Sequence, residues 1–225
     1  MIIVTGASRG LGNAICNFLI KKNIEVYGIA RNVEHLDFPA SACDITKPEE
    51  IKAIAKKLKS EGKKITGLIN TAGVAAMNLA ILTPSEVAKK IVETNLLGTI
   101  YCSQIFAPLM IRNKDGFIVN FSTIAVALGL KGESIYVASK AGIEAFTRVF
   151  AREVGDFNIN VNCIAPGPIE TDLIQGISDK IINNIMNQQL IRKKYTTETV
   201  CDLIDLFMDP KSKSITGEVI NIGGV

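Results

Sequence analysis

The sequence predicts one α/β domain over residues 1–225, with a doubly wound parallel sheet of about seven strands and helices on both faces. Short apolar runs alternate with amphipathic stretches almost to the C-terminus, an alternation typical of such sheets. Several runs are rich in Ile and Val without polar alternation, as expected of parallel strands covered on both faces. No linker, low-complexity tract or internal repeat divides the 225 residues, a length that can bury one full core.

The individual elements follow from hydrophobic spacing. The expected strands cover residues 1–5, 24–30, 65–70, 117–122, 159–165 and 219–222. Helical spacing marks two amphipathic helices, one with Leu11, Ala14, Ile15, Phe18 and Leu19, the other with Ile51, Ile54, Ala55 and Leu58. Capping boxes at 46–49 and 83–86, each with a proline in the first turn, are expected to start two helices. A further helix is expected over 136–155.

Composition argues against several classes of function. The net charge of +3 is small and dispersed, which argues against nucleic acid. Lysine pairs at 56–57, 63–64 and 193–194 are expected at solvated helix ends and loops. No apolar run reaches the roughly 18 residues of a membrane span, and no basic segment precedes the first strand. We therefore expect a cytoplasmic protein without membrane attachment.

The cysteines and the histidine do not predict a metal site. The five cysteines, at positions 16, 43, 102, 163 and 201, form no CxxC and no metal-ligand spacing. His35 is the only histidine and has no His or Cys partner nearby in the sequence. An odd number of scattered cysteines is typical of buried thiols in a reducing compartment.

A glycine-rich turn follows the first expected strand, and a helix begins directly after it. The turn contains Gly6, Ser8, Arg9, Gly10, Leu11 and Gly12. Glycines let the backbone turn sharply and approach a pyrophosphate, while the helix N-terminus offers free N–H groups to the phosphates. The spacing is GxxxGxG rather than the common GxGxxG. The turn predicts a dinucleotide site, and a tight structural turn is the alternative.

The end of the second strand indicates which dinucleotide binds. NAD sites usually place Asp or Glu there to accept hydrogen bonds from the ribose, whereas this chain has Gly28-Ile29-Ala30-Arg31-Asn32. Arg31 together with Arg9 could bracket a 2′-phosphate through charge-assisted hydrogen bonds. We therefore expect NADP(H) as the cofactor. Two arginines that are merely exposed on the surface are the alternative.

Tyr136 and Lys140 form the candidate catalytic pair. Their i, i+4 spacing places both side chains on one face of the expected helix. A tyrosine with a pKa near 10 is a poor acid at neutral pH, and a nearby ammonium favours the phenolate and should lower that pKa. YxxxK alone is a weak motif, because it arises by chance in helices.

Five motifs in order make the assignment more specific. They are the glycine turn, Asn70-Thr71-Ala72-Gly73, Asn95, Tyr136-Val137-Ala138-Ser139-Lys140 and Pro166-Gly167. With them the chain resembles the short-chain dehydrogenase/reductase family, in register from Thr5 to Gly223-Gly224. It is most similar to the 3-oxoacyl-acyl-carrier-protein reductase branch, through segments 151–154, 166–172 and 216–218. The resemblance implies a Rossmann-type fold, NADP(H), and a homotetramer or homodimer.

The resemblance also implies roles for single residues. Tyr136 would protonate the carbonyl oxygen as hydride arrives, Lys140 would hold the nicotinamide ribose, and Asn95 would hold a water in a proton relay to Lys140. Without the other motifs, Asn95 would be interpreted as a helix-surface residue. The implied cofactor contacts are Asp44 and Ile45 at the adenine, Asn70, Ala72 and Gly73 at the ribose, and Pro166, Gly167, Ile169 and Thr171 at the carboxamide and phosphates.

One departure concerns the usual catalytic serine, which lies thirteen residues before the tyrosine in this family. That position is Thr123 here, within Asn120-Phe121-Ser122-Thr123. A threonine hydroxyl has the same donor and acceptor capacity, although its methyl group restricts the rotamers. Ser122 should point to the opposite side if the strand continues. We therefore expect Thr123 to bind the substrate oxygen.

The substrate is less well specified. The YxxxK spacing argues against the enoyl reductases of the superfamily. Apolar residues are expected around the substrate, namely Val74, Ala75, Ala76, Met77, Leu79, Ile124, Val126, Leu128, Leu130 and, on a flap around 167–195, Leu173, Ile174 and Ile177. Such a wall suits an acyl chain or another apolar ketone, although any buried loop shows apolar residues. The resemblance slightly favours a 3-oxoacyl thioester, carried by acyl carrier protein or not, over small ketones or sugars.

Other features leave alternatives open. The apolar segment after Gly73 and the aromatic Phe157 weaken the acyl-carrier hypothesis, because the carrier-protein reductases have polar or basic residues there. Lys114 keeps one plausible basic contact with the acidic carrier.

A catalytically silent nucleotide-binding sensor is a further alternative. Helices around 87–112 and 136–155 pair across subunits in this family, but their apolar residues could equally form the monomer core.

Overall fold

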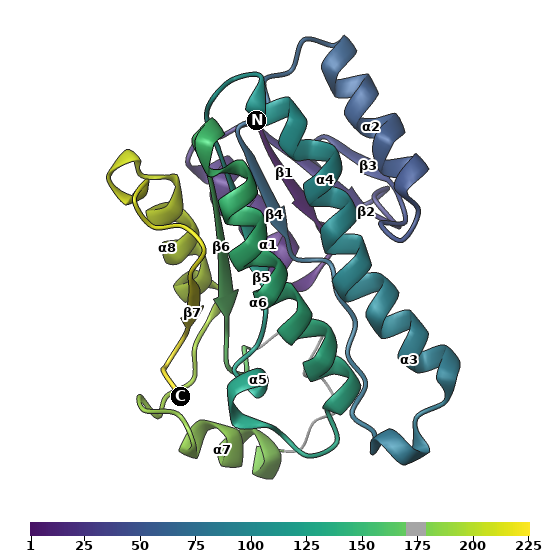
Figure 1. The fold of residues 1–225 in the computed structure, drawn as a ribbon, viewed down its shortest axis with the longest axis vertical. Coiled ribbons are helices and arrows are strands. Elements are labelled where there is room, and N and C mark those ends of the chain that lie inside the picture. The colour runs from purple at the N-terminus through teal and green to yellow at the C-terminus, as the bar shows by residue number, and fades with distance from the viewer. Residues whose placement is uncertain (170–178) are drawn as a thin grey trace.

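The computed structural model describes residues 1–169 and 179–225. These residues form a parallel seven-stranded sheet in the order β3-β2-β1-β4-β5-β6-β7 (Figure 1). The strands are β1 Ile2–Thr5, β2 Val26–Ala30, β3 Ala40–Ala42, β4 Gly67–Asn70, β5 Gly116–Phe121, β6 Ile159–Ala165 and β7 Val219–Asn221. The predicted doubly wound α/β fold is confirmed.

Helices cover both faces of the sheet. One face carries α1 (Gly10–Lys21) and α8 (Thr197–Met208), which pack on each other. The other face carries α2 (Pro48–Ser60), α4 (Gly98–Ile111) and α6 (Ser134–Val154). A π-helical turn, η2 (Glu93–Leu97), joins α3 (Ser85–Val92) to α4. The shorter helices are η1 (Ala80–Leu82), α5 (Ala125–Leu128), η3 (Gly155–Phe157), α7 (Asp179–Asn187) and η5 (Pro210–Ser212).

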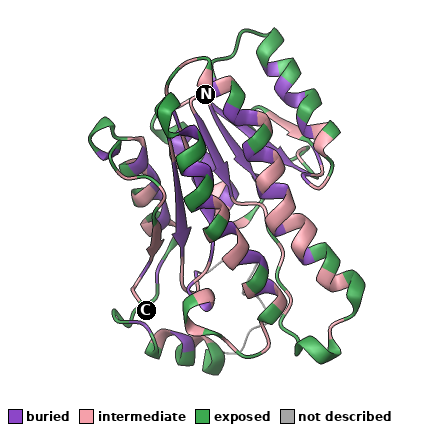
Figure 2. Ribbon diagram, viewed as in Figure 1, coloured by how far each residue is buried: buried purple, intermediate pink, exposed green. Residues whose placement is uncertain are grey.

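The core consists of two apolar layers, one on each side of the sheet. Ile3 and Phe106 belong to the layer beneath α2, α4 and α6, and Ile15 and Val200 to the layer beneath α1 and α8. Strands β1, β2 and β4 are buried along their whole length, as Figure 2 shows. This explains their continuous apolar sequences, because each strand faces a helical layer on both sides.

Two sequence expectations about elements differ from the structure. β3 was not among the six expected strands: its three residues are partly exposed and carry no apolar pattern. The two capping boxes do not form. The hydroxyl of Thr46 donates to Asp44 Oδ1 at 2.9 Å, and the hydroxyl of Thr83 donates to the carbonyl of Leu79 at 3.0 Å. Both threonines therefore stabilise the preceding turn rather than the helix end.

All five cysteines are buried and free, as expected from their spacing. Among the described residues, no helix is long and apolar enough to cross a membrane. The strand order reverses between β1 and β4, so the connections that follow these two strands lead to opposite faces of the sheet and leave a crevice at their carboxyl ends. In open α/β sheets ligands bind in such a crevice.

Candidate active site

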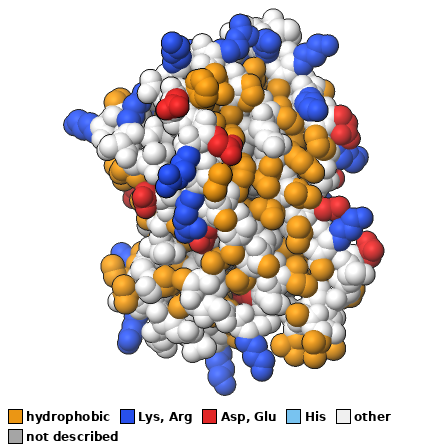
Figure 3. Space-filling view, in the orientation of Figure 1, with side chains coloured by type: hydrophobic (Ala, Val, Ile, Leu, Met, Phe, Trp, Pro, Cys, Tyr) orange, Lys and Arg blue, Asp and Glu red, His pale blue; other side chains and the backbone are white. Residues whose placement is uncertain are grey.

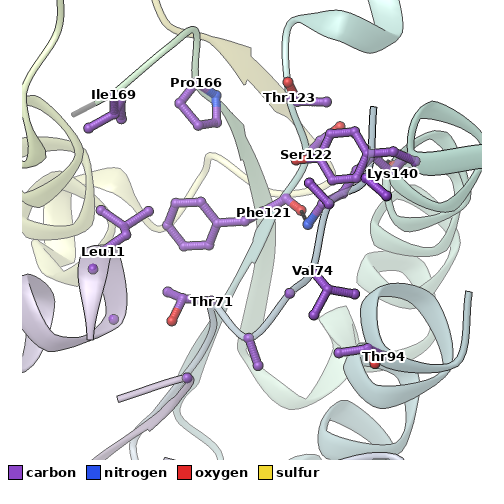
Figure 4. Close-up of a pocket in the computed structure, with 18 of the residues that line it drawn as sticks. Leu11, Thr71, Val74, Thr94, Phe121, Ser122, Thr123, Lys140, Pro166 and Ile169 are labelled. Atoms are coloured by element: carbon purple, nitrogen blue, oxygen red, sulfur yellow. Dashed lines mark hydrogen bonds between the residues drawn. The ribbon is translucent and has the colours of Figure 1, made fainter. Parts of the chain in front are cut away.

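A cavity of about 1150 Å³ lies at the carboxyl end of the sheet. Residues of the glycine turn, of the strand ends and of α6 line it together. In Figure 4, Leu11 and Ile169 lie on one side of the cavity, and Lys140, Val74 and Thr94 lie on the other. The cavity therefore joins the expected cofactor motif to the expected catalytic segment.

The glycine turn has the geometry of a dinucleotide-binding turn. Gly6 and Gly10 have φ angles of 68° and 53°, a region that favours glycine. A Cβ on Gly12 would collide with the carbonyl oxygen of Gly6, so only glycine lets α1 start this close to β1. The hydroxyl of Thr71 donates to the carbonyl of Thr5 and holds β4 against the turn. Gly6, Ser8, Arg9, Gly10, Leu11 and Gly12 all line the cavity.

The loops after β2 and β3 form another part of the cavity wall. Arg31, Asp44 and Ile45 line it, as does Arg9 from the glycine turn. Burial raises the pKa of the Asp44 carboxyl, but hydrogen bonds from the amide and hydroxyl of Thr46 outweigh it, and the net pKa is lowered. Asp44 is therefore an anionic acceptor at neutral pH, beside a region that otherwise carries arginines.

His35 has a role in the structure that the sequence did not suggest. Its Nε2 atom lies 2.9 Å from the carbonyl oxygen of Ser8, in the glycine turn. This contact ties the loop after β2 to the loop after β1 across 27 residues of sequence. A lone histidine without sequence neighbours carries no signal for such a contact.

Tyr136 and Lys140 both line the cavity and both are buried. Lys140 Nζ lies 5.9 Å from the centroid of the Tyr136 ring and donates to the carbonyl of Phe121 at 2.8 Å. Burial lowers the pKa of the Lys140 ammonium to about 8. The expected lowering of the Tyr136 pKa is not found: burial raises it, and the Glu133 carboxylate raises it further. Desolvation of the phenol, together with the Glu133 carboxylate, therefore sets the direction of the shift.

Thr123 and Ser122 face different surroundings. Thr123 is half-buried, lines the cavity, and its hydroxyl accepts a hydrogen bond from the Ala125 amide at 3.2 Å. The hydroxyl of Ser122 donates to Glu144 Oε1 at 2.7 Å, on α6. Ser122 also borders the cavity, but its hydroxyl is bonded to Glu144 of α6. The Thr123 hydroxyl remains available as a donor.

Asn95 lies in the π-helical turn and is completely buried, so it is not a helix-surface residue. Its Oδ1 accepts from the Val74 amide at 2.8 Å, and its Nδ2 donates to the Val74 carbonyl at 2.9 Å and to Ser139 Oγ at 3.1 Å. A Cβ on Gly73 would lie 3.3 Å from Asn95 Oδ1 and 3.7 Å from Lys140 Nζ. The absence of a side chain at Gly73 therefore leaves space between these two polar groups.

The other expected cofactor contacts fall into three groups. Ala72, Gly73, Pro166, Gly167 and Ile169 line the cavity. Asn70 does not: its Nδ2 donates to Asn120 Oδ1 at 2.9 Å and to Ser103 Oγ at 3.2 Å, inside the core. Thr71 lines the cavity in its place. Thr171 lies outside the described residues.

The remaining part of the cavity wall is mostly apolar. Val74, Ala75, Ala76, Met77, Ile124 and Leu130 line it as expected, whereas Leu79, Val126 and Leu128 do not. Helix α7 adds Ile181, Ile182 and Ile185 from the expected flap, while Leu173, Ile174 and Ile177 lie outside the described residues. Glu133, three residues before Tyr136, also lines the cavity and was missed. Its position one turn before the tyrosine was the available signal.

Comparison with known proteins places the fold and these motifs in one family. The short chain dehydrogenase family model matches residues 1–181. The chain belongs to the short-chain dehydrogenase family. This identifies it as an oxidoreductase, and no group of His, Cys, Asp or Glu within the described residues could hold a metal ion.

Relatives extend over the whole chain. The 3-oxoacyl-[acyl-carrier-protein] reductase FabG of Staphylococcus epidermidis is 30% identical over 238 residues, covering 99% of this chain and 96% of that protein. Among solved structures, ElxO with NADP bound has 26% identity, a TM-score of 0.88, and covers 98% and 96% of the two chains. A 4-hydroxyisoleucine dehydrogenase in complex with NADH has 26% identity, a TM-score of 0.91, and covers 99% and 97%.

Proposed function

We propose that this chain is an NADPH-dependent reductase that converts a carbonyl to an alcohol, with a 3-oxoacyl thioester as its substrate. One observation carries the proposal: Tyr136, Lys140 and Thr123 line the same cavity as the glycine turn. A proton donor, a cation and a hydroxyl therefore lie within reach of one bound nucleotide and one bound carbonyl. The name of the Staphylococcus epidermidis relative supports the choice of substrate.

The bound nicotinamide would supply the hydride, and the chain would supply the proton. Tyr136 would donate its phenolic proton to the carbonyl oxygen, which the Thr123 hydroxyl would hold by a hydrogen bond. Burial keeps the Tyr136 phenol protonated at neutral pH, as a proton donor must be. The Lys140 ammonium, with a pKa of about 8, remains largely charged at pH 7 and would stabilise the phenolate that forms.

Proton resupply would run through the space beside Gly73. Asn95 Oδ1 and Lys140 Nζ border this space, and each has hydrogen-bonding capacity beyond its partners in the protein. Lys140 would pass a proton to the Tyr136 phenolate, and a water held in this space would then return a proton to Lys140 after each turnover. Asn95 would thus position the water and, through its two bonds to Val74, the segment that covers the substrate.

The preference for NADPH rests on Arg9 and Arg31, because β2 ends without an acid to accept hydrogen bonds from ribose hydroxyls. Similar structures hold NADP in one case and NADH in another, so the family alone does not decide. Comparison of kcat/KM with the two cofactors tests the preference. We expect NADPH to be favoured and Arg31→Glu to reverse the order. A clear NADH preference of the unaltered chain would overturn the proposal.

The reaction itself is tested by following NADPH oxidation with acetoacetyl thioesters beside simple ketones and sugars, with Tyr136→Phe as the inactive control. Faster turnover of thioesters supports the proposal. The apolar segment Val74-Ala75-Ala76-Met77 and the exposed Phe157 favour the second candidate, a reductase of small ketones or sugars, which would show the opposite ranking. Nucleotide binding without turnover of any carbonyl would identify a sensor instead.

The proposed enzyme would act in the cytoplasm as a homo-oligomer and could accept its thioester from acyl carrier protein. Apolar side chains gather over α4 and α6 on the face seen in Figure 3, and Val149 of α6 is 56% exposed. Pairing of these helices between copies would cover that surface. Light scattering should give a dimer or tetramer mass, and a monomer mass at micromolar concentration would refute the assembly.

A further inference from the structure

Glu133 is a carboxylate at the cavity wall that the reaction described above does not use. It occupies the N-cap position of α6, and its side chain makes no capping hydrogen bond. Within residues 1–169 and 179–225 its carboxylate has no hydrogen-bond or ion-pair partner. Among the described residues, nothing therefore competes with a ligand for this carboxylate.

The loop that carries Glu133 forms one side of the substrate part of the cavity. The amide of Asn78 donates to the carbonyl of Gly132 at 2.8 Å, which joins this loop to the segment after Gly73. Met77 and Leu130 line the cavity on these two segments. Glu133 lines the cavity from the same loop as Leu130.

Glu133 also lies close to the proposed proton donor. It precedes Tyr136 by three residues, which places the two side chains on the same side of the helix start. Its charge reaches the phenol, because the Glu133 carboxylate raises the pKa of Tyr136. Burial in turn raises the pKa of Glu133 itself. A group attached near the reacting carbonyl would therefore lie within electrostatic range of Glu133.

We propose that Glu133 is a specificity-determining residue that accepts a hydrogen bond from an N–H or O–H of the substrate and disfavours substrates with a carboxylate beside the ketone. This inference rests on the proposed function, since it concerns the carbonyl compound that the cavity binds. A desolvated carboxylate gains a charge-assisted hydrogen bond from an amide or hydroxyl donor. A substrate carboxylate in the same place would meet a like charge in a poorly solvated cavity.

Other charged side chains also line the cavity. Arg9, Arg31 and Asp44 belong to the loops after β1, β2 and β3, which we assign to the nucleotide. Lys140 is held by the carbonyl of Phe121. Lys90 and Glu93 line the cavity from α3 and η2, and Glu93 is also within 3.9 Å of Lys89. Glu93 therefore offers a matched control, as a carboxylate of the same cavity at another position.

Two ketones of the same shape test the proposal. Acetoacetamide and acetoacetate differ by an amide in place of a carboxylate, so their kcat/KM ratio reports the charge that the site prefers. We expect the wild-type chain to favour acetoacetamide by on the order of tenfold or more. Glu133→Gln should bring the ratio close to one, whereas Glu93→Gln should leave it unchanged. A ratio that Glu133→Gln does not alter, or that both variants alter equally, overturns the proposal.

Two further measurements separate the possible failures. If neither ketone nor any thioester were reduced, the proposed function would be wrong. The role of Glu133 would then be tested separately by calorimetric measurement of the affinities of the two ketones. Equal affinities would overturn that role. Thermal unfolding distinguishes a cap from a substrate contact. If Glu133 capped the helix, its replacement by Gln would lower the stability of the fold. An unpaired, half-buried carboxylate would instead give a more stable Gln variant at pH 7, because its raised pKa reflects a cost of ionisation in the fold.

Discussion

Replacement of Lys140 by methionine should abolish turnover. It should also remove a pH-dependent cost in the free energy of folding, which arises from the buried ammonium. Lys140 is 6% exposed, and burial lowers the pKa of its ammonium from 10.5 to about 8. Such a difference corresponds to about 3 kcal/mol of folding free energy. The unfolded chain binds the proton more tightly, so this cost is fully present below pH 8 and disappears as pH rises past 10.5. The stability advantage of the variant should therefore shrink by about 2 kcal/mol between pH 7 and 9.5.

Urea unfolding of both chains at several pH values measures this difference. The variant also loses the hydrogen bond from Lys140 to the carbonyl of Phe121, but that loss adds a nearly constant offset and leaves the slope with pH intact. Lys56→Met provides the control, because Lys56 is exposed on α2. A difference between Lys140→Met and wild type that stays flat with pH would refute the idea that the fold holds a desolvated ammonium.

Three further substitutions test the turn, the substrate oxygen site and the π-helical turn. Gly12→Ala places a Cβ against the backbone oxygen of Gly6, so the variant should bind the cofactor at least about tenfold more weakly in a fluorescence titration. Gly155→Ala is the control, because the space around Gly155 is open, and it should bind the cofactor with unchanged affinity. Thr123→Val should lower kcat by roughly 100-fold while Ser122→Ala has little effect, and the reverse ranking would assign the contact to Ser122. Asn95→Leu removes three buried hydrogen bonds and should cost about 2–4 kcal/mol in urea unfolding; a loss below about 1 kcal/mol would contradict the contacts described.

The sheet was predictable because its central strands are buried on both faces, which leaves continuous apolar runs in the sequence. β3 escaped prediction because an edge strand of three partly exposed residues makes no such run; only its pairing with β2 defines it. The starts of α2 at Pro48 and of α3 at Ser85 were predicted correctly, but the capping hydrogen bonds were not. A threonine followed by Pro and Glu satisfies the capping pattern, but Thr46 and Thr83 both find acceptors in the preceding turn. Local patterns cannot rank such competing partners.

In the candidate site, too, local features were predictable from the sequence, whereas features that depend on tertiary packing were not. The spacing of Tyr136 and Lys140 on one helix, and the glycine turn, are local features, and the structure brings both to one cavity. The orientation of Asn70 is decided by the core, which turns its amide away from the cavity. The contact of His35 with the carbonyl of Ser8 depends on a segment 27 residues away in the sequence. The pKa of Tyr136 likewise follows from burial, which a motif does not record.

The polar network around Asn70 links the elements that carry Tyr136 and Thr123, and so fixes their relative position. Asn70 on β4 donates to Asn120 on β5 and to Ser103 on α4, and Asn120 donates to Thr147 on α6 at 2.9 Å. All four side chains are buried, and within the described residues Asn70 Oδ1 has no partner. An incompletely satisfied polar network stabilises a core less than apolar packing does, but its bonds have fixed lengths and directions. Since α6 carries Tyr136 and β5 leads to Thr123, these bonds fix the proton donor relative to the hydroxyl that would hold the substrate oxygen.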